Sequence, residues 1–208
     1  MKKNILFVLL TVLLSSCFEL DNYDAPNAGI NGSLIDSETG EVVYTEQPDG
    51  CRIKLLDLGY KDPTPLYFWA KANGTFRNVA LFEGDYKVSP IEGPFFPVTE
   101  EELSLKGVTD HNFKVTPYLK IKLVEVVPGE AGEVTVKFSL KRSTVPEGME
   151  IGKKTISEAW LLCNTMPVVS YYNGGYNDEL SVKKTLSRTS DETIESKDQE
   201  ITLDKLKS

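Results

Sequence analysis

Residues 119–123 read LKIKL and residues 134–141 read VTVKFSLK, and these two segments decide the fold class. In both, apolar and polar residues alternate strictly, which places all the apolar side chains on one face of a β-strand. The segment between them, residues 128–132, reads PGEAG and suits a turn. The two segments are therefore predicted to form a hairpin with one buried and one solvated face.

Upstream of this hairpin, several short apolar segments alternate with residues that favour turns. These strand candidates are residues 29–35, 51–55, 66–72 and 86–89. Because helical periodicity is almost absent, we predict an all-β fold. Strand spacing of about ten residues on both sides of residues 115–117 predicts two β-sandwiches in tandem, over residues 28–116 and 117–208.

Two local signals carry more specific expectations. Asn73–Gly74 follows an apolar segment and precedes Thr75–Phe76, which predicts a tight type I′ connection. Thr99–Glu102 has the spacing of a capping box and predicts one short helical turn, since Gly107 follows too soon for a long helix.

The amino terminus predicts an exported lipoprotein. Lys2 and Lys3 precede a ten-residue apolar run, residues 5–14, which is too short to cross a hydrocarbon core about 30 Å thick. Residues 14–17, LSSC, resemble the bacterial lipobox, in which the cysteine is acylated before cleavage. We therefore expect a signal peptide over residues 1–16 and a lipid on Cys17 that anchors the chain to a membrane. The alternative is an ordinary secretory peptide that ends near a cysteine.

An acidic tether, residues 17–27, follows the predicted cleavage site and contains Glu19, Asp21 and Asp24. It resembles the signal by which Bacteroidota send lipoproteins to the outer face of the outer membrane. The expected location is therefore the outer membrane, lipid-anchored and facing the cell exterior. A solvated linker is the alternative reading of the same residues.

The net charge argues against nucleic acid as a partner. It is −8 for the whole chain and −10 once Lys2 and Lys3 are removed with the signal peptide. Binding to phosphates requires a basic face whose counterions are released, and no Lys/Arg cluster in the sequence provides one. The acidity instead suits a soluble, self-repelling surface.

Few residues are available for catalysis or for a metal site. His111 is the only histidine, which excludes a multi-histidine metal site. Any Ser/His/Asp triad would have to contain His111, which we expect in a surface or turn position. We predict no catalytic residues, no metal and no cofactor. Cys51 and Cys163 lie in different predicted domains within apolar segments, and buried free thiols are favoured, although a disulfide is not ruled out.

Three motifs, taken in order, carry a family resemblance. They are residues 32–41 (GSLIDSETGE), residues 73–76 (NGTF) and residues 83–88 (EGDYKV). Together they resemble the carboxypeptidase-regulatory-like, transthyretin-like β-sandwich. With the lipobox and an immunoglobulin-like second sandwich, the whole chain resembles a two-domain lipoprotein family of Bacteroidota, of unassigned function, associated with polysaccharide-utilisation loci.

The resemblance has one departure, at the carboxyl terminus. The compared proteins continue past the equivalent of residues 201–203 into a closing strand, whereas this sequence stops at Ser208. The expected immunoglobulin-like sandwich therefore either lacks its last strand or has rebuilt it. A missing strand would leave an unpaired edge at which another chain could add one.

Aromatic clusters are the best candidates for ligand contact, because the apolar CH face of a sugar stacks on an aromatic ring. One cluster is Tyr171, Tyr172, Asn173 and Tyr176, in a glycine-rich turn that could instead pack on its own sandwich. The other is Phe95–Phe96 between two prolines, for which a core position is the alternative. Trp69 and Trp160 alternate with other residues along strands and are expected in the core.

These observations predict a non-catalytic surface lipoprotein that assists glycan uptake. It would contact a polysaccharide, or pack against a TonB-dependent transporter and its glycan-binding lid lipoprotein. The alternative function is a structural or adhesive envelope lipoprotein that accepts a partner strand at an open sheet edge. An enzyme with an unrecognised pair of carboxylates is a third reading that no motif supports.

Overall fold

The computed structural model describes residues 24–149, 155–172 and 174–204 and confirms the predicted all-β fold. The first domain contains eight strands: β1 (Ala28–Asp36), β2 (Arg52–Asp57), β3 (Leu66–Trp69), β4 (Thr75–Leu81), β5 (Gly84–Ile91), β6 (Glu101–Leu105), β7 (Val108–Asp110) and β8 (Phe113–Val115). Strand β1 pairs with β4, β7 and β8, and a second sheet has the order β3-β2-β5-β6.

The first domain is a closed sandwich. Alternate residues of both sheets, such as Ile30 and Leu34 of β1 and Ile53 and Leu55 of β2, are fully buried between the sheets. The rings of Phe76 and Phe113, with centroids 5.4 Å apart, pack against each other in this core. Both faces that the alternating pattern makes apolar are therefore covered within the domain.

The second domain consists of the remaining elements: β9 (Leu119–Pro128), the 3-10 turn η2 (Glu130–Gly132), β10 (Val134–Arg142), β11 (Glu158–Leu161), β12 (Val182–Thr185), α2 (Asp191–Glu195) and β13 (Gln199–Leu203). Its larger sheet has the order β13-β10-β9, and β11 pairs with β12 in a two-stranded sheet. The predicted hairpin is β9–β10, antiparallel from Leu119 opposite Arg142 to Pro128 opposite Val134.

The second domain covers its apolar face only in part. Phe138, Leu140 and Ile201 pack with Ile194 of α2 in a small core. Strand β9, at the edge of its sheet, carries the same alternating pattern, yet the side chain of Ile121 is 70% exposed and that of Leu123 is 60% exposed.

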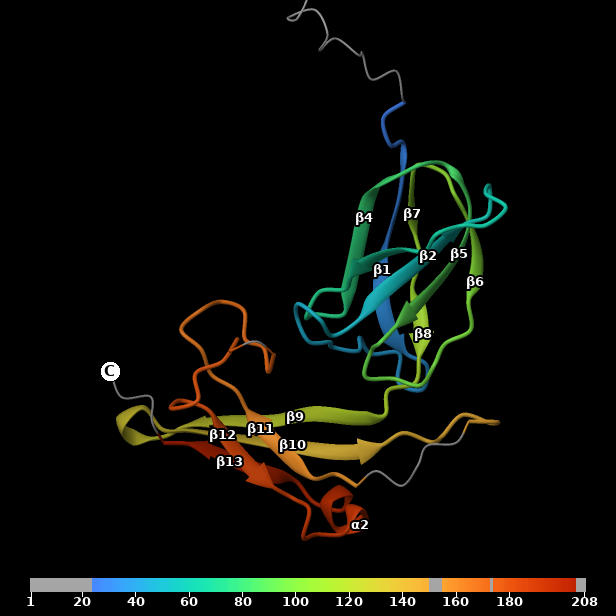
Figure 1. Cartoon of the computed structure of the whole chain (residues 1–208). Helices are drawn as coiled ribbons and strands as arrows, with labels where there is room; N and C mark the ends of the chain where they lie inside the picture. Colours follow the sequence, from blue (N-terminus) through green and yellow to red (C-terminus); the bar gives the residue numbers. More distant parts are fainter. Residues whose placement is uncertain (1–23, 150–154, 173, 205–208) are drawn as a thin grey trace, which may run out of the picture.

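Figure 1 shows the first domain on one side of the β9–β10 hairpin, with the loop that follows β11 rising on the same side. The two domains are tied by Lys120 of β9, which forms ion pairs with Asp36, at 3.5 Å, and with Glu38. Within the part of the chain that the structure describes, no helix is long and apolar enough to cross a bilayer.

Two local predictions are wrong. Asn73–Gly74 does not close a hairpin, because β3 pairs with β2 whereas β4 pairs with β1 in the other sheet. Gly74 has φ +73° but Asn73 is not left-handed, so the turn is not of type I′. The predicted helical turn at residues 99–102 is absent: residues 99 and 100 lie outside any element, and β6 begins at Glu101, pairs with β5 and buries Leu105.

Candidate functional site

The tyrosine turn, residues 170–178, brings two of the predicted contact residues together. The rings of Tyr171 and Tyr176 are nearly parallel, with an interplanar angle of 4° and centroids 6.2 Å apart. The indole of Trp160 on β11 meets both rings edge-on, at 5.1 Å from Tyr171 and 6.1 Å from Tyr176. Tyr171 and its neighbour Tyr172 are both more than half exposed. The turn therefore presents an aromatic cluster to solvent.

Hydrogen bonds hold the tyrosine turn in place from within the second domain. The N–H of Ser170 donates to the carbonyl of Gly175 at 3.0 Å, and the side-chain amide of Asn164 donates to the same carbonyl at 2.9 Å. The N–H of Asn177 donates to the carbonyl of Cys163 at 2.8 Å. The aromatic cluster is therefore ordered before any ligand arrives, which lowers the entropy cost of binding.

The first domain also contacts the tyrosine turn. Glu46, in the loop after β1, accepts hydrogen bonds from the hydroxyl of Ser170 at 2.6 Å and from the N–H of Tyr172 at 3.0 Å. The bond from Ser170 is partly buried, whereas the bond from Tyr172 is exposed to solvent. The position of the predicted contact residues thus depends on both domains.

Charged groups surround the indole of Trp160. Its N–H donates to Glu158 at 2.9 Å, and the Lys183 ammonium lies 4.4 Å from the ring centroid while pairing with the same carboxylate at 3.0 Å. Hydrogen bonds from Lys183 and then from Trp160 hold the pKa of Glu158 below its ordinary value. On the other side, the hydrogen bond with Asp178 raises the pKa of Tyr176. Polar groups thus border the aromatic cluster.

The other predicted contact residues lie elsewhere. Asn173, like Cys17, is outside the described residues. Phe95 and Phe96 are each only 3% exposed: Phe95 packs in the core of the first domain, and the Phe96 ring lies 5.0 Å from that of Tyr118. A buried ring has no free face for a sugar, so of the two readings of this pair the burial supports the core position and not ligand contact.

An exposed aromatic pair on β3 was missed by the sequence prediction, which placed Trp69 in the core. Trp69 is 42% exposed, and the guanidinium of Arg52 lies 5.4 Å from its ring centroid and 4.6 Å from that of Tyr67. Glu92, at a left-handed φ of 59°, accepts a hydrogen bond from Arg52 Nε at 2.6 Å. Phe68 packs inward against the core, and its neighbours on the strand point to the opposite face. The alternation within residues 67–69 therefore could have indicated that Tyr67 and Trp69 are exposed.

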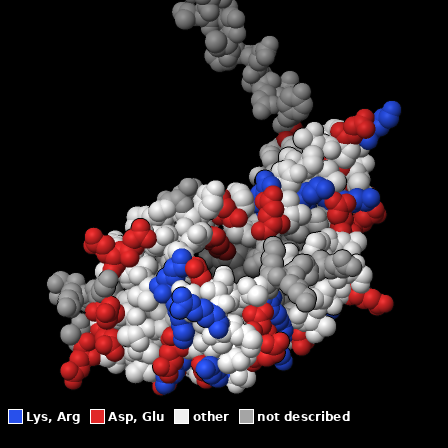
Figure 2. All heavy atoms as spheres, turned by 60° about the horizontal axis from the view of Figure 1, so that its bottom comes forward, with Lys and Arg blue, Asp and Glu red and all other residues white. Residues whose placement is uncertain are grey.

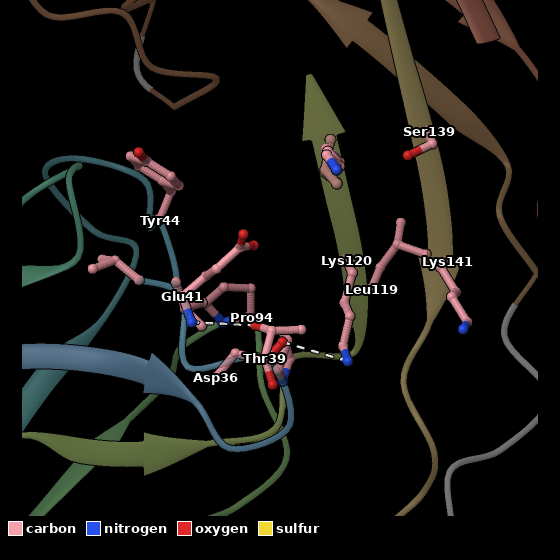
Figure 3. A pocket seen from close by; sticks show the side chains of 14 residues that line it. Asp36, Thr39, Glu41, Tyr44, Pro94, Leu119, Lys120, Ser139 and Lys141 are labelled. Carbon is pink, nitrogen blue, oxygen red and sulfur yellow. Dashed lines mark hydrogen bonds and ion pairs between the residues drawn. The ribbon is translucent and has the colours of Figure 1, made fainter. Parts of the chain in front are cut away.

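A cleft of about 420 Å³ lies between the domains (Figure 3). Glu41 and Tyr44 line it on the side of the first domain, and Lys120, Ser139 and Lys141 line it on the side of the β9–β10 sheet. This volume is within the range of about 300–1,000 Å³ that small-molecule sites occupy. Asp36, at its base, is buried, which raises its pKa, but hydrogen bonds from the Glu38 N–H and Thr39 and the charge of Lys120 outweigh burial and lower it overall.

The features required for catalysis are sparse in the described residues. His111 lies between β7 and β8, where its Nε2 is 3.1 Å from a carboxylate oxygen of Glu101 and its ring packs edge-on against Phe113. Within residues 24–149, 155–172 and 174–204, no cluster of three or more His, Cys, Asp or Glu side chains could hold a metal ion.

The two cysteines of the described residues are free thiols. Cys51 is buried, as expected, and burial raises its pKa to about 12. Cys163 is half-buried, so only one of the two expected core positions is correct. A thiol with so high a pKa as that of Cys51 is a poor nucleophile at neutral pH.

Comparison with known proteins identifies the first domain. Residues 28–116 match the family model described as the N-terminal domain of a protein of unknown function, DUF3823. A comparison with curated proteins gave no match.

Solved structures resemble both domains together. A DUF3823 family protein from Bacteroides uniformis has a TM-score of 0.68 and 23% identity, covering 86% of this chain and 83% of that one. A DUF3823 family protein from Parabacteroides merdae has a TM-score of 0.62 and 21% identity, covering 86% and 81%. A second Bacteroides uniformis protein, described as a "putative carbohydrate binding protein", has a TM-score of 0.61 and 22% identity, covering 86% and 80%. The expected resemblance to a Bacteroidota family of unassigned function is confirmed.

Proposed function

We propose that this chain, whose residues 28–116 match the DUF3823 N-terminal domain, is a non-catalytic surface lipoprotein that contacts glycans as an accessory of an uptake complex. The observation that carries the proposal is the solvent-exposed aromatic cluster of the tyrosine turn. Its exposed member Tyr171 is backed by Tyr176 and by the edge of Trp160. The carbohydrate-binding description of a structurally similar protein supports the same class of ligand.

The chemistry of the tyrosine turn suits a sugar. The free face of Tyr171 is available to the apolar CH face of a pyranose ring, while ordered hydrogen-bonding groups lie beside it. Asp178 and Glu158 border the cluster and can accept hydrogen bonds from sugar hydroxyls, since a carboxylate is an acceptor. Because backbone hydrogen bonds already hold Ser170, Gly175 and Asn177, binding need not order these residues of the turn.

Calorimetric titration with soluble polysaccharides tests the glycan contact. The panel comprises xylan, pectin, laminarin and mucin glycans, and the Tyr171→Ala/Tyr176→Ala variant is compared with the parent chain. An aromatic contact contributes about 0.5–1.5 kcal/mol, so loss of both rings is expected to weaken binding by about tenfold or more. Tyr60→Ala is the matched control, because Tyr60 is also exposed but lies in the first domain between β2 and β3.

The titration also separates the two accessory roles. Binding by the parent chain that the double variant loses and the Tyr60 control keeps supports direct glycan contact. If the parent chain binds none of these glycans but co-purifies with a TonB-dependent transporter and its lid, direct contact is wrong and a packing role remains. Binding that the double variant retains would place the contact away from the tyrosine turn.

The lipid anchor is tested separately, because Cys17 lies outside the described residues. Replacement of Cys17 by Ala is expected to release the protein from the membrane fraction, since the sequence offers no second apolar segment to hold it. Protection from external protease on intact cells would contradict the outward orientation. A Cys17→Ala protein that stays membrane-bound would contradict the lipid anchor.

A second candidate function rests on the exposed apolar residues of β9. Ile121 and Leu123 line a cleft of about 320 Å³ between the two sheets of the second domain, together with Phe138 and Leu161. Strand β9 pairs only with β10 among the described residues, so one of its edges is unpaired there. An extended segment of a partner protein could pair with this edge and cover both side chains, as in β-strand addition.

Site-specific photo-crosslinking on intact cells tests this second candidate. A photoreactive residue in place of Val124 on β9 is expected to yield one discrete adduct, and the same residue in place of the equally exposed Val79 on β4 is the control. The adduct should disappear when Ile121→Lys and Leu123→Lys are added. Absence of any adduct, or the same adduct from both positions, would contradict strand acceptance at β9.

A further inference from the structure

Three lysines, Lys120, Lys122 and Lys141, form a cation block on one wall of the cleft between the domains. On the antiparallel β9–β10 pair, Lys120 lies directly opposite Lys141, and Lys122 lies directly opposite Ser139. Residues directly opposite each other share a face of the sheet, and so do residues two apart along a strand. All four side chains therefore lie on one face, and all four line the cleft.

Only one of the three lysines is neutralised. Lys120 is paired with Asp36 and Glu38 of the first domain, which accounts for its role in joining the domains. Lys122 and Lys141 have no ion pair or side-chain hydrogen bond with any described residue, and both are exposed. Two uncompensated positive charges thus remain on this wall of the cleft.

The charges around these lysines are not evenly balanced. Lys120 lies directly opposite Lys141, but its own charge is already balanced by Asp36 and Glu38. The chain as a whole carries a net charge of −8, and on the face shown in Figure 2 Lys and Arg lie interspersed among Asp and Glu. Two carboxylates, Asp36 and Glu41, also line the cleft. Asp36 is paired with Lys120, so Glu41 is the one further carboxylate of the lining against the two charges of Lys122 and Lys141.

The opposite wall of the cleft supplies aromatic and polar groups. Tyr44, in the loop after β1, is 74% exposed and is one of the residues that line the cleft (Figure 3). Thr39 and Ser139 add hydroxyl groups from the two sides. An aromatic ring, hydroxyls and two neighbouring lysines without ion-pair partners in the described part of the chain are the groups that recognise a sugar with an attached anionic group.

We infer that the cleft between the domains binds an anionic saccharide, one that carries a carboxylate or a sulfate group. Lys122 and Lys141 contact the anionic group, Ser139 donates a hydrogen bond between them, and Tyr44 packs on the sugar ring. Diagonal neighbours on an antiparallel sheet are about 7–8 Å apart, a span over which two long lysine side chains can converge on one anion. The choice of a sugar rests on the proposed glycan contact, whereas the site is separate from the tyrosine turn.

Titration of the full chain with defined oligosaccharides tests this inference. The anionic probes are oligogalacturonate and a chondroitin sulfate oligosaccharide, and a malto-oligosaccharide of equal length is the neutral probe. Lys122→Gln/Lys141→Gln is expected to bind the preferred anionic probe at least about tenfold more weakly than the parent chain, since it removes two charged hydrogen-bond donors. Lys122→Arg/Lys141→Arg keeps the charge and should retain binding.

A control with the same loss of charge isolates the cleft. Lys61 and Lys106 are exposed, belong to the first domain and do not line the cleft, so Lys61→Gln/Lys106→Gln should bind anionic probes like the parent chain. Tyr171→Ala/Tyr176→Ala should also retain anionic binding, because it alters only the tyrosine turn. Preference for oligogalacturonate would identify a carboxylate as the ligand group, and preference for the sulfated probe would identify a sulfate.

Three results would overturn the inference. One is that the parent chain binds no anionic probe. Another is that Lys122→Gln/Lys141→Gln binds as well as the parent chain, and the third is that Lys61→Gln/Lys106→Gln loses binding to the same extent. In each case neutral glycans that still bind through the tyrosine turn would leave the proposed function standing, so the two failures are distinguishable.

Discussion

Strands of the first and second domains share the same alternating pattern, but the two domains cover their apolar faces differently. In the first domain, Leu34 of β1 and Leu55 of β2 are completely buried between two four-stranded sheets. In the second, the three-stranded sheet faces only a two-stranded one, and Ile121 and Leu123 stay largely exposed. An alternating pattern therefore specifies which face is apolar, whereas the opposing layer decides whether that face is buried.

This difference assigns different roles to the two domains. The first domain supplies its own opposing layer, so its stability depends little on other molecules. In the second domain, exposed apolar surface, the cation block and the tyrosine turn all lie at the β9–β10 hairpin or against β11. The candidate contacts therefore concentrate where packing is incomplete, with Tyr44 and Glu46 of the first domain completing two of them.

The strongest test of the comparison is Leu34→Ala. Leu34 is fully buried on the central strand of its sheet, and truncating such a leucine costs about 2–5 kcal/mol in free energy of unfolding. Chemical denaturation can be followed separately in the two domains, because Trp69 and Trp160 are the two tryptophans of the chain. Each domain is followed in a protein in which the other tryptophan is replaced by Phe. Leu34→Ala should then strongly lower the denaturant midpoint reported by Trp69 fluorescence. An equal shift of the Trp160 transition would mean that the domains unfold as one unit.

The next largest effect concerns the tie between the domains. Asp36→Asn removes the ion pair to Lys120 and weakens the part-buried hydrogen bond that the carboxylate accepts from the Glu38 N–H, so a loss of about 1–3 kcal/mol in free energy of unfolding is expected at pH 7. The folded-state pKa of Asp36 is below its ordinary value of 3.8, so this contribution is present above that pH and is lost as the pH falls through the lower folded-state pKa. Denaturation from pH 7 down to pH 2 should show the difference between the two proteins shrinking in acid. A difference independent of pH would contradict the assignment.

Much of the fold was predictable because it depends on local patterns. The alternation of residues 119–123 and 134–141 specified the β9–β10 hairpin, and an all-β chain followed from the near absence of helical periodicity. Asn73–Gly74 was misjudged because its flanking strands pair in different sheets, a non-local choice that the turn residues do not encode.

The candidate site was less predictable, for the same reason. The aromatic residues of the tyrosine turn were found from composition, but their contact with Glu46 joins residues more than 120 positions apart. Phe95 and Phe96 are buried whereas Tyr67 and Trp69 are exposed, and this difference depends on what packs against each segment. The cation block required the register of β9 on β10, which places Lys122 opposite Ser139.

A smaller effect is expected at the contact between the first domain and the tyrosine turn. Glu46→Ala removes the acceptor for Ser170 and Tyr172, and an ordinary hydrogen bond contributes about 0.5–1.5 kcal/mol. We expect a loss of that order in the Trp160 transition and weaker glycan binding from a less ordered turn. Glu83→Ala is the matched control, because Glu83 is also an exposed glutamate of the first domain, between β4 and β5, and its side chain makes no hydrogen bond with a described residue of the tyrosine turn. Equal effects of the two substitutions would argue that Glu46 does not position the turn.

The smallest effect completes the comparison with Leu34. Leu123→Ala makes the same chemical change on a strand with the same alternation, but the side chain is already 60% exposed. Its truncation removes little buried area, so the free energy of unfolding should change by no more than about 0.5 kcal/mol. The measurement is the Trp160 transition of the isolated chain, repeated on membranes that contain the cell's other envelope proteins. A loss comparable to that of Leu34→Ala in the isolated chain would show that this face is covered in solution, whereas a loss that appears only on membranes would point to a partner that covers it.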